Sequence, residues 1–256
     1  MRIALISDIH GNLVSLDTVL ADIHREGADQ IICLGDVPMF GPQPCQVMAR
    51  LQALDCPCVM GNHDLELLNP GSAQEDFNEP AEVVEWMEWC AGQLSLADFD
   101  YLRSFQPSIR VPLDARTTLL CFHGSPRSHK DSILATTPAA ELDEMLAGPA
   151  LSAAAGLVAT VMAGGHTHVQ MLRRYKSALI VNVGSVGFPV ERIPFEGSPR
   201  FMPWAEYAIV NWANGNLGVE LRRVAIALDA VKQAALDSDM PNDAFWVEQW
   251  ITPTIG

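Results

Sequence analysis

The chain contains 256 residues, 49% hydrophobic and 18% charged, a composition typical of a folded globular protein that excludes intrinsic disorder. It has 16 lysine and arginine residues and 31 aspartate and glutamate residues, which give a formal net charge of −15. Because non-specific binding to DNA or RNA depends on basic side chains that displace counterions, this charge argues against a nucleic-acid partner and a polybasic membrane anchor.

We expect a single domain over residues 1–256, since this length is ordinary for one large α/β unit and short for two. None of the six cysteines forms a Cys-x-x-Cys pair, so we expect reduced thiols rather than a structural zinc site or a disulfide framework. The first apolar run reaches only to Ile6, which is too short for a secretory leader, and we expect a cytoplasmic protein.

Five short apolar runs along the chain each end abruptly in polar or ionisable residues. Such runs are typical of strands buried on both faces. Because ligands of an open α/β sheet gather beyond the carboxyl ends of its strands, we expect the polar residues after these runs to meet at one edge. The five predicted strands are Arg2–Ile6, Gln30–Leu34, Pro57–Met60, Thr118–Phe122 and Leu157–Ala163.

Two crossover helices are predicted near the start of the chain. Apolar side chains recur at helical spacing between Leu13 and Ile23, with Asn12 as a plausible N-cap and Gly27 as a stop signal. A strand, this helix and the next strand form a βαβ unit, which predicts a parallel strand pair. A second helix is expected over Gly41–Ala53.

Residues 65–107 differ in character and are interpreted as a helical cap or insertion. Within them, Ala81–Gln93 predicts an acidic helix with an apolar stripe. We expect Trp86 to pack on the main core, whereas Trp89 stays open between packing on that core and a role in a cap over the site or a dimer surface. The 81–93 helix is therefore also a candidate surface for a homo-oligomer.

The uncharged run from Met145 to Gly165 is interpreted as a short helix beginning near Pro149, followed by the fifth strand. It is rich in alanine and interrupted by glycine, so we expect no membrane span. Residues 201–256 predict a hairpin of Tyr207–Trp212 and Gly218–Val224, then a helix over Leu228–Leu236. Aromatic residues near the end are expected to dock on the body of the protein, namely Phe245, Trp246 and Trp250.

The polar residues that follow the strands include more potential metal ligands than one ion uses. If two cations share Asp36, each receives four protein ligands. Mixed nitrogen and oxygen donors suit Mn, Fe, Zn or Ni rather than Ca or Mg, and we favour Mn. Two adjacent divalent ions can hold a bridging hydroxide and stabilise both ends of an in-line displacement at phosphorus. The predicted ligands are Asp8, His10, Asp36, Asn62, His123, His166 and His168.

Each fragment has an ordinary structural interpretation when taken alone. An Asp-x-His segment is often a helix-capping aspartate with a surface histidine, and Gly-Asp after a strand is often a turn. The joint occurrence of these fragments, always at the end of an apolar run, favours a dinuclear site.

The same fragments resemble the signature blocks of a known family. Asp8-x-His10, Gly35-Asp36, Gly61-Asn62-His63-Asp64, His123 and Gly165-His166-x-His168 match, in order and spacing, the five blocks of the calcineurin-like metallophosphoesterases. Further stretches resemble the small bacterial phosphoesterase branch of that family. The resemblance implies an α/β fold, a four-layer αββα sandwich of two mixed β-sheets.

The resemblance also implies a role for each site residue. One ion is expected on Asp8, His10, Asp36 and His168, and the other on Asp36, Asn62, His123 and His166. His63 matches the catalytic histidine of the family, which steadies the phosphoryl oxygen or protonates the leaving group. Asp64 is expected to orient the His63 imidazole.

Two departures from the branch pattern bear on substrate choice. Pro38-Met39-Phe40 stands where the branch usually has a small or apolar residue and tyrosine, and Asn182-Val183-Gly184-Ser185 lacks the proline of Asn-Pro-Gly-Ser. Neither departure touches a predicted metal ligand.

The expected activity is hydrolysis of a phosphomonoester or a small phosphodiester by a metal-bridging hydroxide, with His63 assisting the leaving group. A phosphoprotein phosphatase is an alternative on the same fold. A non-catalytic metal-binding scaffold that uses the 81–93 helix is another, although such relatives tend to lose ligands that are all present here. A nuclease is disfavoured because the sequence offers no basic groove.

Overall fold

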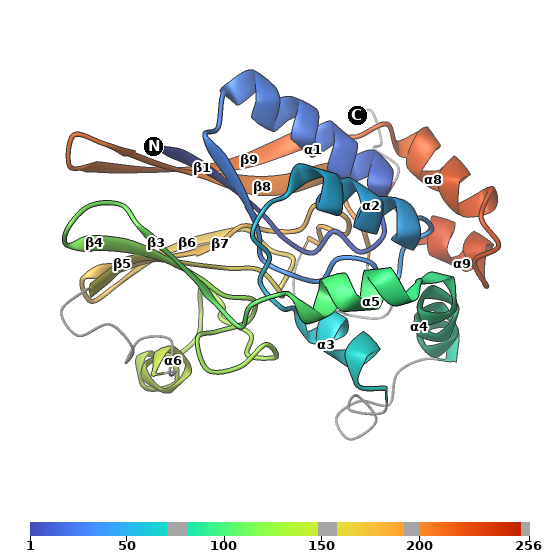
Figure 1. Cartoon of the computed structure of the whole chain (residues 1–256), viewed down its shortest axis with the longest axis horizontal. Helices are drawn as coiled ribbons and strands as arrows, with labels where there is room; N and C mark the ends of the chain where they lie inside the picture. Colours follow the sequence, from blue (N-terminus) through green and yellow to red (C-terminus); the bar gives the residue numbers. More distant parts are fainter. Residues whose placement is uncertain (71–80, 148–157, 192–199, 252–256) are drawn as a thin grey trace.

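The computed structural model describes residues 1–70, 81–147, 158–191 and 200–251. Two β-sheets lie face to face, with helix α1 outside one sheet and helix α6 outside the other (Figure 1). The predicted four-layer αββα sandwich is therefore confirmed. The described helices are α1 (Leu13–Glu26), α2 (Pro44–Leu54), α3 (Asn62–Leu68), α4 (Ala81–Gln93), α5 (Leu96–Arg103), α6 (Ala139–Leu146), α8 (Leu228–Leu236) and α9 (Asp243–Glu248).

The first sheet has the strand order β2-β1-β8-β9, and it is mixed. β1 pairs in parallel with β2, as the βαβ pattern predicts, and antiparallel with β8. The predicted hairpin is β8 and β9, which is longer than expected at both ends. The strands are β1 (Arg2–Ile6), β2 (Gln30–Cys33), β8 (Trp204–Ala213) and β9 (Asn216–Ala225).

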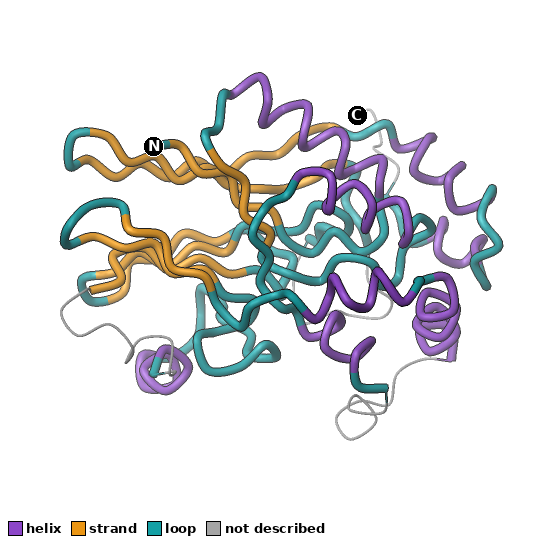
Figure 2. Tube along the Cα trace, viewed as in Figure 1, coloured by secondary structure: helices purple, strands orange, loops and turns teal. Residues whose placement is uncertain are grey.

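The second sheet has the order β3-β4-β5-β7-β6. Its central strands β4, β5 and β7 are parallel, and its outer strands β3 and β6 are antiparallel to their neighbours. Figure 2 shows the strands of both sheets stacked on one side of the molecule, with loops leaving toward the other side, where most of the helices lie. The strands are β3 (Ile109–Pro112), β4 (Thr117–Cys121), β5 (Val158–Gly164), β6 (Met171–Tyr175) and β7 (Ala178–Asn182).

Strand β1 shows why the apolar runs are continuous. Ile3 and Leu5 belong to the core between the two sheets, whereas Ala4 and Ile6 belong to the core beneath helix α1. A strand covered on both faces has no solvent side on which polar residues would be favoured. Helix α1 begins where predicted: the Asn12 side chain accepts a hydrogen bond from the backbone of Ser15.

One predicted strand is wrong. Pro57–Met60 forms isolated bridges, Cys33 with Cys58 and Val59 with Gln106, and not a strand of either ladder. Helix α3 then begins at Asn62, so the polar residues that follow this run form the first turn of a helix. The polar residues after the strands meet at one end of the sandwich, but they come from both sheets. Strands β1 and β2 belong to the first sheet, and strands β4 and β5 belong to the second. The helix expected near Pro149 lies outside the described residues.

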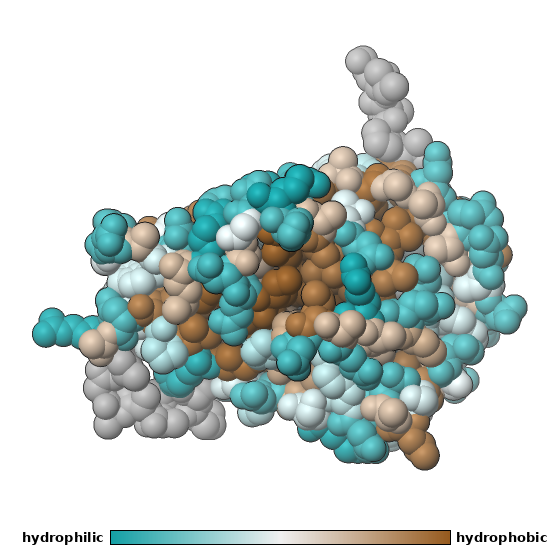
Figure 3. Space-filling view, turned by 45° about the horizontal axis from the view of Figure 1, so that its top comes forward, coloured by the Kyte–Doolittle hydropathy of each residue, from teal (hydrophilic) through white to brown (hydrophobic). Residues whose placement is uncertain are grey.

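The aromatic residues of the C-terminal region pack as predicted. Trp246 and Trp250 are buried and share a cluster with Trp86, whose indole N–H donates to the carbonyl of Pro241. Trp86 is therefore unavailable to a partner, and Trp89 is partly buried against the same core. On the face seen in Figure 3, hydrophobic residues gather in the middle between hydrophilic ones.

Two further expectations concern thiols and membranes. The six cysteines are all free thiols, as predicted. Within the described part of the chain, no helix has both the length and the apolar character needed to cross a membrane.

Candidate metal centre

Most of the predicted ligands have an unusual backbone conformation. A non-glycine residue with positive φ is uncommon, and such residues cluster at functional sites where the surroundings hold them in place. Five of the seven predicted ligands have this conformation: Asp8 at φ 53°, His10 at 49°, Asp36 at 57°, His166 at 68° and His168 at 58°.

Backbone contacts between loops fix these conformations. The Asp8 amide donates to the carbonyl of Gly35 at 2.9 Å, and the His10 amide donates to the carbonyl of Asp36 at 3.1 Å. Two glycines permit the close packing, since a Cβ at Gly61 would lie 2.1 Å from Asp36 Oδ1 and one at Gly165 would lie 2.5 Å from Asp8 Oδ2. The Gly-Asn-His and Gly-His motifs thus place backbone directly against the carboxylates.

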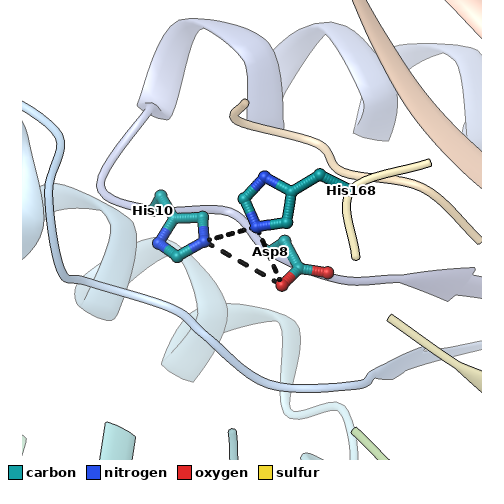
Figure 4. Close-up of side chains that lie close together, drawn as sticks. All are labelled: Asp8, His10 and His168. Atoms are coloured by element: carbon teal, nitrogen blue, oxygen red, sulfur yellow. Dashed lines mark hydrogen bonds and ion pairs between the residues drawn. The ribbon is translucent and has the colours of Figure 1, made fainter. Parts of the chain in front are cut away.

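The first cluster joins Asp8 and His10 after β1 to His168 after β5 (Figure 4). The Nε2 atoms of His10 and His168 lie 3.1 Å apart, and Nε2 of His168 lies 3.4 Å from Asp8 Oδ1. Each Nδ1 faces a carbonyl oxygen, that of Met39 for His10 and that of Phe188 for His168. A carbonyl only accepts, so each Nδ1 carries the hydrogen and, in the neutral rings, both Nε2 lone pairs point into the cluster.

The second cluster joins Asp36, His123 and His166. Asp36 Oδ2 lies 3.2 Å from Nε2 of His123. The Asn62 side-chain oxygen lies 3.0 Å from the same nitrogen and 2.9 Å from Nδ1 of His166. Nδ1 of His123 donates to the carbonyl of Leu34 at 2.8 Å, which leaves Nε2 for the cluster. All four members of the second predicted ligand set are therefore in contact.

Asp36 lies between the two clusters. Its Oδ2 is 3.2 Å from Nε2 of His123 in one cluster and 3.9 Å from Nε2 of His10 in the other. Asp8 Oδ1 is buried and has no hydrogen-bond partner among the described residues. Opposed lone pairs and an unpartnered buried carboxylate oxygen are costly without a cation, so these residues fit a pair of divalent ions.

His63 stands beside this centre on the first turn of α3. Its Nε2 is 3.9 Å from Asp36 Oδ2, and its Nδ1 is 2.8 Å from Glu66 Oε2. Its ring meets the Phe40 ring edge-on at a centroid distance of 4.6 Å. The side chain is 25% exposed, so His63 is accessible at the rim of the centre.

The structure corrects the predicted role of Asp64. Its carboxylate accepts hydrogen bonds from the backbone amides of Asp36, Val37 and Gly61 at 2.8–3.0 Å, and among the described residues it makes no hydrogen bond to the His63 imidazole. Asp64 holds the loop that carries Asp36, whereas Glu66 holds the His63 ring. The i, i+3 spacing of His63 and Glu66 could have revealed this contact had a helix been predicted there.

Burial and charge divide the histidines into two groups. Burial and the neighbouring His168 lower the pKa of His10 to about 3, and burial with His123 lowers that of His166 to about 4. Burial also acts to lower the pKa of His123, but the carboxylates of Asp36 and Asp8 outweigh it and raise the pKa to about 10. His10 and His166 are therefore neutral near pH 7, as metal ligands must be, while His123 carries a proton that a metal would displace.

The remaining ionisable groups follow the same rules. Burial opposes ionisation of Asp8, but His168 and His123 outweigh it and lower its pKa to about 2. Burial opposes protonation of His63, but Asp36 and Glu66 raise its pKa above the ordinary value. Burial and the charge of Asp36 raise the pKa of Asp64 to about 6.

Comparison with known proteins identifies the family. Residues 1–199 match the model of the calcineurin-like phosphoesterase superfamily domain. The chain belongs to this superfamily. The matched region contains every predicted ligand and His63, so the family assignment and the geometry concern the same residues.

Individual relatives match over shorter stretches or at lower identity. An uncharacterized protein of Methanocaldococcus jannaschii is 44% identical over 84 residues, 33% of this chain and 35% of that protein. The symmetrical bis(5'-nucleosyl)-tetraphosphatase of Pseudomonas syringae is 30% identical over 91 residues, 34% of this chain and 31% of that enzyme. The chain thus spans about a third of the length of these curated relatives.

Two solved structures match nearly the whole fold. A metallophosphoesterase from Sphaerobacter thermophilus superposes with a TM-score of 0.69 at 26% identity, covering 97% of this chain and 98% of the other. A hypothetical protein from Pyrococcus horikoshii gives a TM-score of 0.75 at 17% identity, with 96% of each chain covered. The second similarity concerns the fold alone.

Proposed function

We propose that this chain is a dinuclear metal-dependent phosphoesterase that hydrolyses phosphomonoesters or small phosphodiesters. The observation that carries the proposal is the position of Asp36, whose Oδ2 faces one imidazole of each ligand cluster. A carboxylate shared in this way is the arrangement that a two-ion centre requires. Membership of the phosphoesterase superfamily supports the same chemistry.

The donor set determines which ions are suitable. The first ion would be held by Asp8, His10, Asp36 and His168, and the second by Asp36, Asn62, His123 and His166. Four imidazoles with carboxylate and amide oxygens suit Mn, Fe, Zn or Ni, and we favour Mn. When bound, such a pair supplies positive charge and an activated water for displacement at phosphorus.

His63 is the group we propose to act on the leaving alcohol. Its Nδ1 is engaged by Glu66, so its Nε2 is free to face a bound phosphoester. Its raised pKa, caused by the Asp36 and Glu66 carboxylates, favours the protonated ring, and a protonated imidazole can donate to the departing oxygen. Asp64 contributes indirectly, by fixing the backbone on either side of Asp36.

Charge favours small substrates. Asp8 and Asp36 provide two negative charges against the four positive charges of two divalent ions, so the loaded centre attracts a phosphate group. The chain as a whole has a net charge of −15, which repels long polyanions. We propose small cellular phosphoesters as substrates, with a phosphoprotein as the alternative, and the cytoplasm as the location.

The proposal is tested with the metal-free protein reloaded with Mn²⁺ and assayed on p-nitrophenyl phosphate and bis(p-nitrophenyl) phosphate. We expect hydrolysis of at least one ester that chelation abolishes. The His63→Ala variant should retain both ions and lose most of kcat. If the wild type binds two ions and cleaves neither ester, nor any phosphoester in a screen of cellular metabolites, the chain is a scaffold and the proposal fails.

Fewer observations support a scaffold role through helix α4. Trp86 already packs on the C-terminal region, and Val84, 41% exposed, is the large apolar side chain that α4 presents to solvent. Self-association through this helix is a separate proposal, which sedimentation of the Val84→Lys variant beside the wild type would test.

A further inference from the structure

The loop after β7 lies directly against the loop after β1. The Gly187 amide donates to the carbonyl of Asp8 at 2.9 Å, and the Ser185 hydroxyl donates to the same carbonyl at 2.7 Å. A Cβ at Gly187 would lie 2.0 Å from the carbonyl oxygen of Ile9, so only glycine permits this approach. The next residue, Phe188, is thereby placed beside His10.

Phe188 contacts both histidines of the first cluster. Its ring stacks on the His10 imidazole at a centroid distance of 5.1 Å and an angle of 7°. Its carbonyl oxygen accepts the Nδ1 hydrogen of His168 at 2.7 Å. One residue thus restrains the two rings whose Nε2 atoms converge beside Asp8.

Phe188 is itself held from behind. Its ring stacks on Phe201 at 4.5 Å and 12°, and it meets Trp246 and Trp250 at 5.7 Å and 6.3 Å. Its amide donates to the Ser185 hydroxyl at 2.7 Å. All of these aromatic side chains are buried, so the Phe188 ring has no alternative position without rearrangement of the C-terminal region.

The second cluster has a different support. His123 is fixed by the Leu34 carbonyl and His166 by Asn62, and their rings contact each other at 5.3 Å. Among the described residues, no ring of the C-terminal aromatic cluster contacts either of these histidines. The two halves of the centre therefore differ in what holds them.

We propose that Phe188 is a positioning residue for one ion only, the ion held by Asp8, His10, Asp36 and His168. The inference rests on the proposed two-ion function. It makes the C-terminal region, through Phe201, part of the support of that ion. Removal of the Phe188 ring should weaken one metal site and leave its neighbour unchanged.

The experiment titrates the metal-free protein with Mn²⁺ by calorimetry. For Phe188→Leu we expect one of two dissociation constants to rise by about tenfold, the low end for loss of a group that orients a ligand. The matched control is Phe245→Leu, which removes a ring that stacks on Trp86 at 5.9 Å, and it should leave both constants unchanged. In an Asn62→Ala background, which keeps every ligand of the first ion, the Phe188→Leu effect should persist.

A second variant and a stability measurement control for a folding defect. Phe201→Leu leaves the Phe188 contacts with both histidines in place and removes only the ring behind them, so we expect a smaller weakening of the same site. Thermal unfolding of each metal-free variant measures its fold independently of metal.

Two outcomes would overturn the inference. Either both constants rise together, which indicates a general structural defect, or neither changes in a folded Phe188→Leu protein. The two-ion proposal is tested separately by the wild-type titration. If the wild-type protein binds fewer than two ions per chain, that proposal fails.

Discussion

Nδ1 of His63 lies 2.8 Å from Oε2 of Glu66, one turn further along helix α3. The contact leaves Nε2 as the only ring nitrogen available to a substrate, and it fixes the direction in which that nitrogen points. A carboxylate in this position also favours the protonated ring, which a general acid requires. Glu66 is thus the partner of the proposed acid.

Replacement of Glu66 by glutamine should lower kcat and leave metal content unchanged. We expect a loss of about 10- to 100-fold, part of the roughly 100- to 10,000-fold that a positioned acid contributes. The loss should be larger for phenyl phosphate than for p-nitrophenyl phosphate. Phenolate is the poorer leaving group, so its departure depends more on the proton that His63 donates. Glu88→Gln, at an exposed position of α4, is the control. An equal loss for both esters would contradict this role.

Replacement of Asp64 by asparagine should destabilise the protein. Its carboxylate accepts three backbone hydrogen bonds in a fully buried position, and an asparagine amide can accept at only one of its two atoms. We expect the free energy of unfolding to fall by about 1–3 kcal/mol, the cost of a buried group without a partner. Urea denaturation of the metal-free protein measures it. Unchanged stability would show that the loop does not depend on these bonds.

Metal binding should release a proton near neutral pH. In the metal-free protein the pKa of His123 is raised to about 10, so His123 is charged at pH 7.5 and must lose its proton to bind an ion. Metal affinity should therefore rise with pH below 10. Calorimetry in buffers of different ionisation enthalpy should give about one proton released; none released would exclude a charged His123.

The same shift predicts how the stability of the metal-free protein depends on pH. Because the folded pKa of His123 is raised, the charged ring contributes stability that is fully present below its unfolded pKa of about 6.5. That contribution is lost as the pH rises through about 10. Urea denaturation at pH 6.5, 8 and 9.5 should show a progressive decrease that His123→Gln lacks.

Two glycine substitutions form a matched pair. At Gly165 a Cβ would lie 2.0 Å from Ser7 Oγ and 2.5 Å from Asp8 Oδ2, so Gly165→Ala should cost about 1–3 kcal/mol of stability and weaken metal binding. At Gly92, within α4, a Cβ would meet nothing within 4 Å, so Gly92→Ala should stabilise by about 0.5–1 kcal/mol. Equal effects of the two changes on metal affinity would contradict the packing argument.

The clustering of the candidate ligands could be expected from the sequence because each of them follows a local pattern. Asp8, Asp36 and His123 come after apolar runs that are buried on both faces, and a buried strand must end in a turn where its polar neighbours emerge. The four-layer arrangement is predicted only by the resemblance to the metallophosphoesterase family. The periodicity of the sequence does not show that the strands divide between two sheets.

The features that the sequence does not predict depend on contacts between distant segments or on an element whose type its composition does not reveal. Pro57–Met60 resembles a strand in composition, so the helix that places Glu66 beneath His63 was not expected. Phe188 belongs to no recognisable motif. Its proposed positioning role follows only from the contact between the loop after β7 and the loop after β1, which are far apart in the sequence. Asp64 was recognised by its motif, but its backbone partners are visible only in three dimensions.

The proposed two-ion centre is most directly tested by anomalous diffraction from crystals of the wild-type protein grown with Mn²⁺. We expect two manganese peaks on either side of the Asp36 carboxylate, one beside His10 and His168 and the other beside His123 and His166. A single peak, or an empty centre at saturating metal, would contradict it.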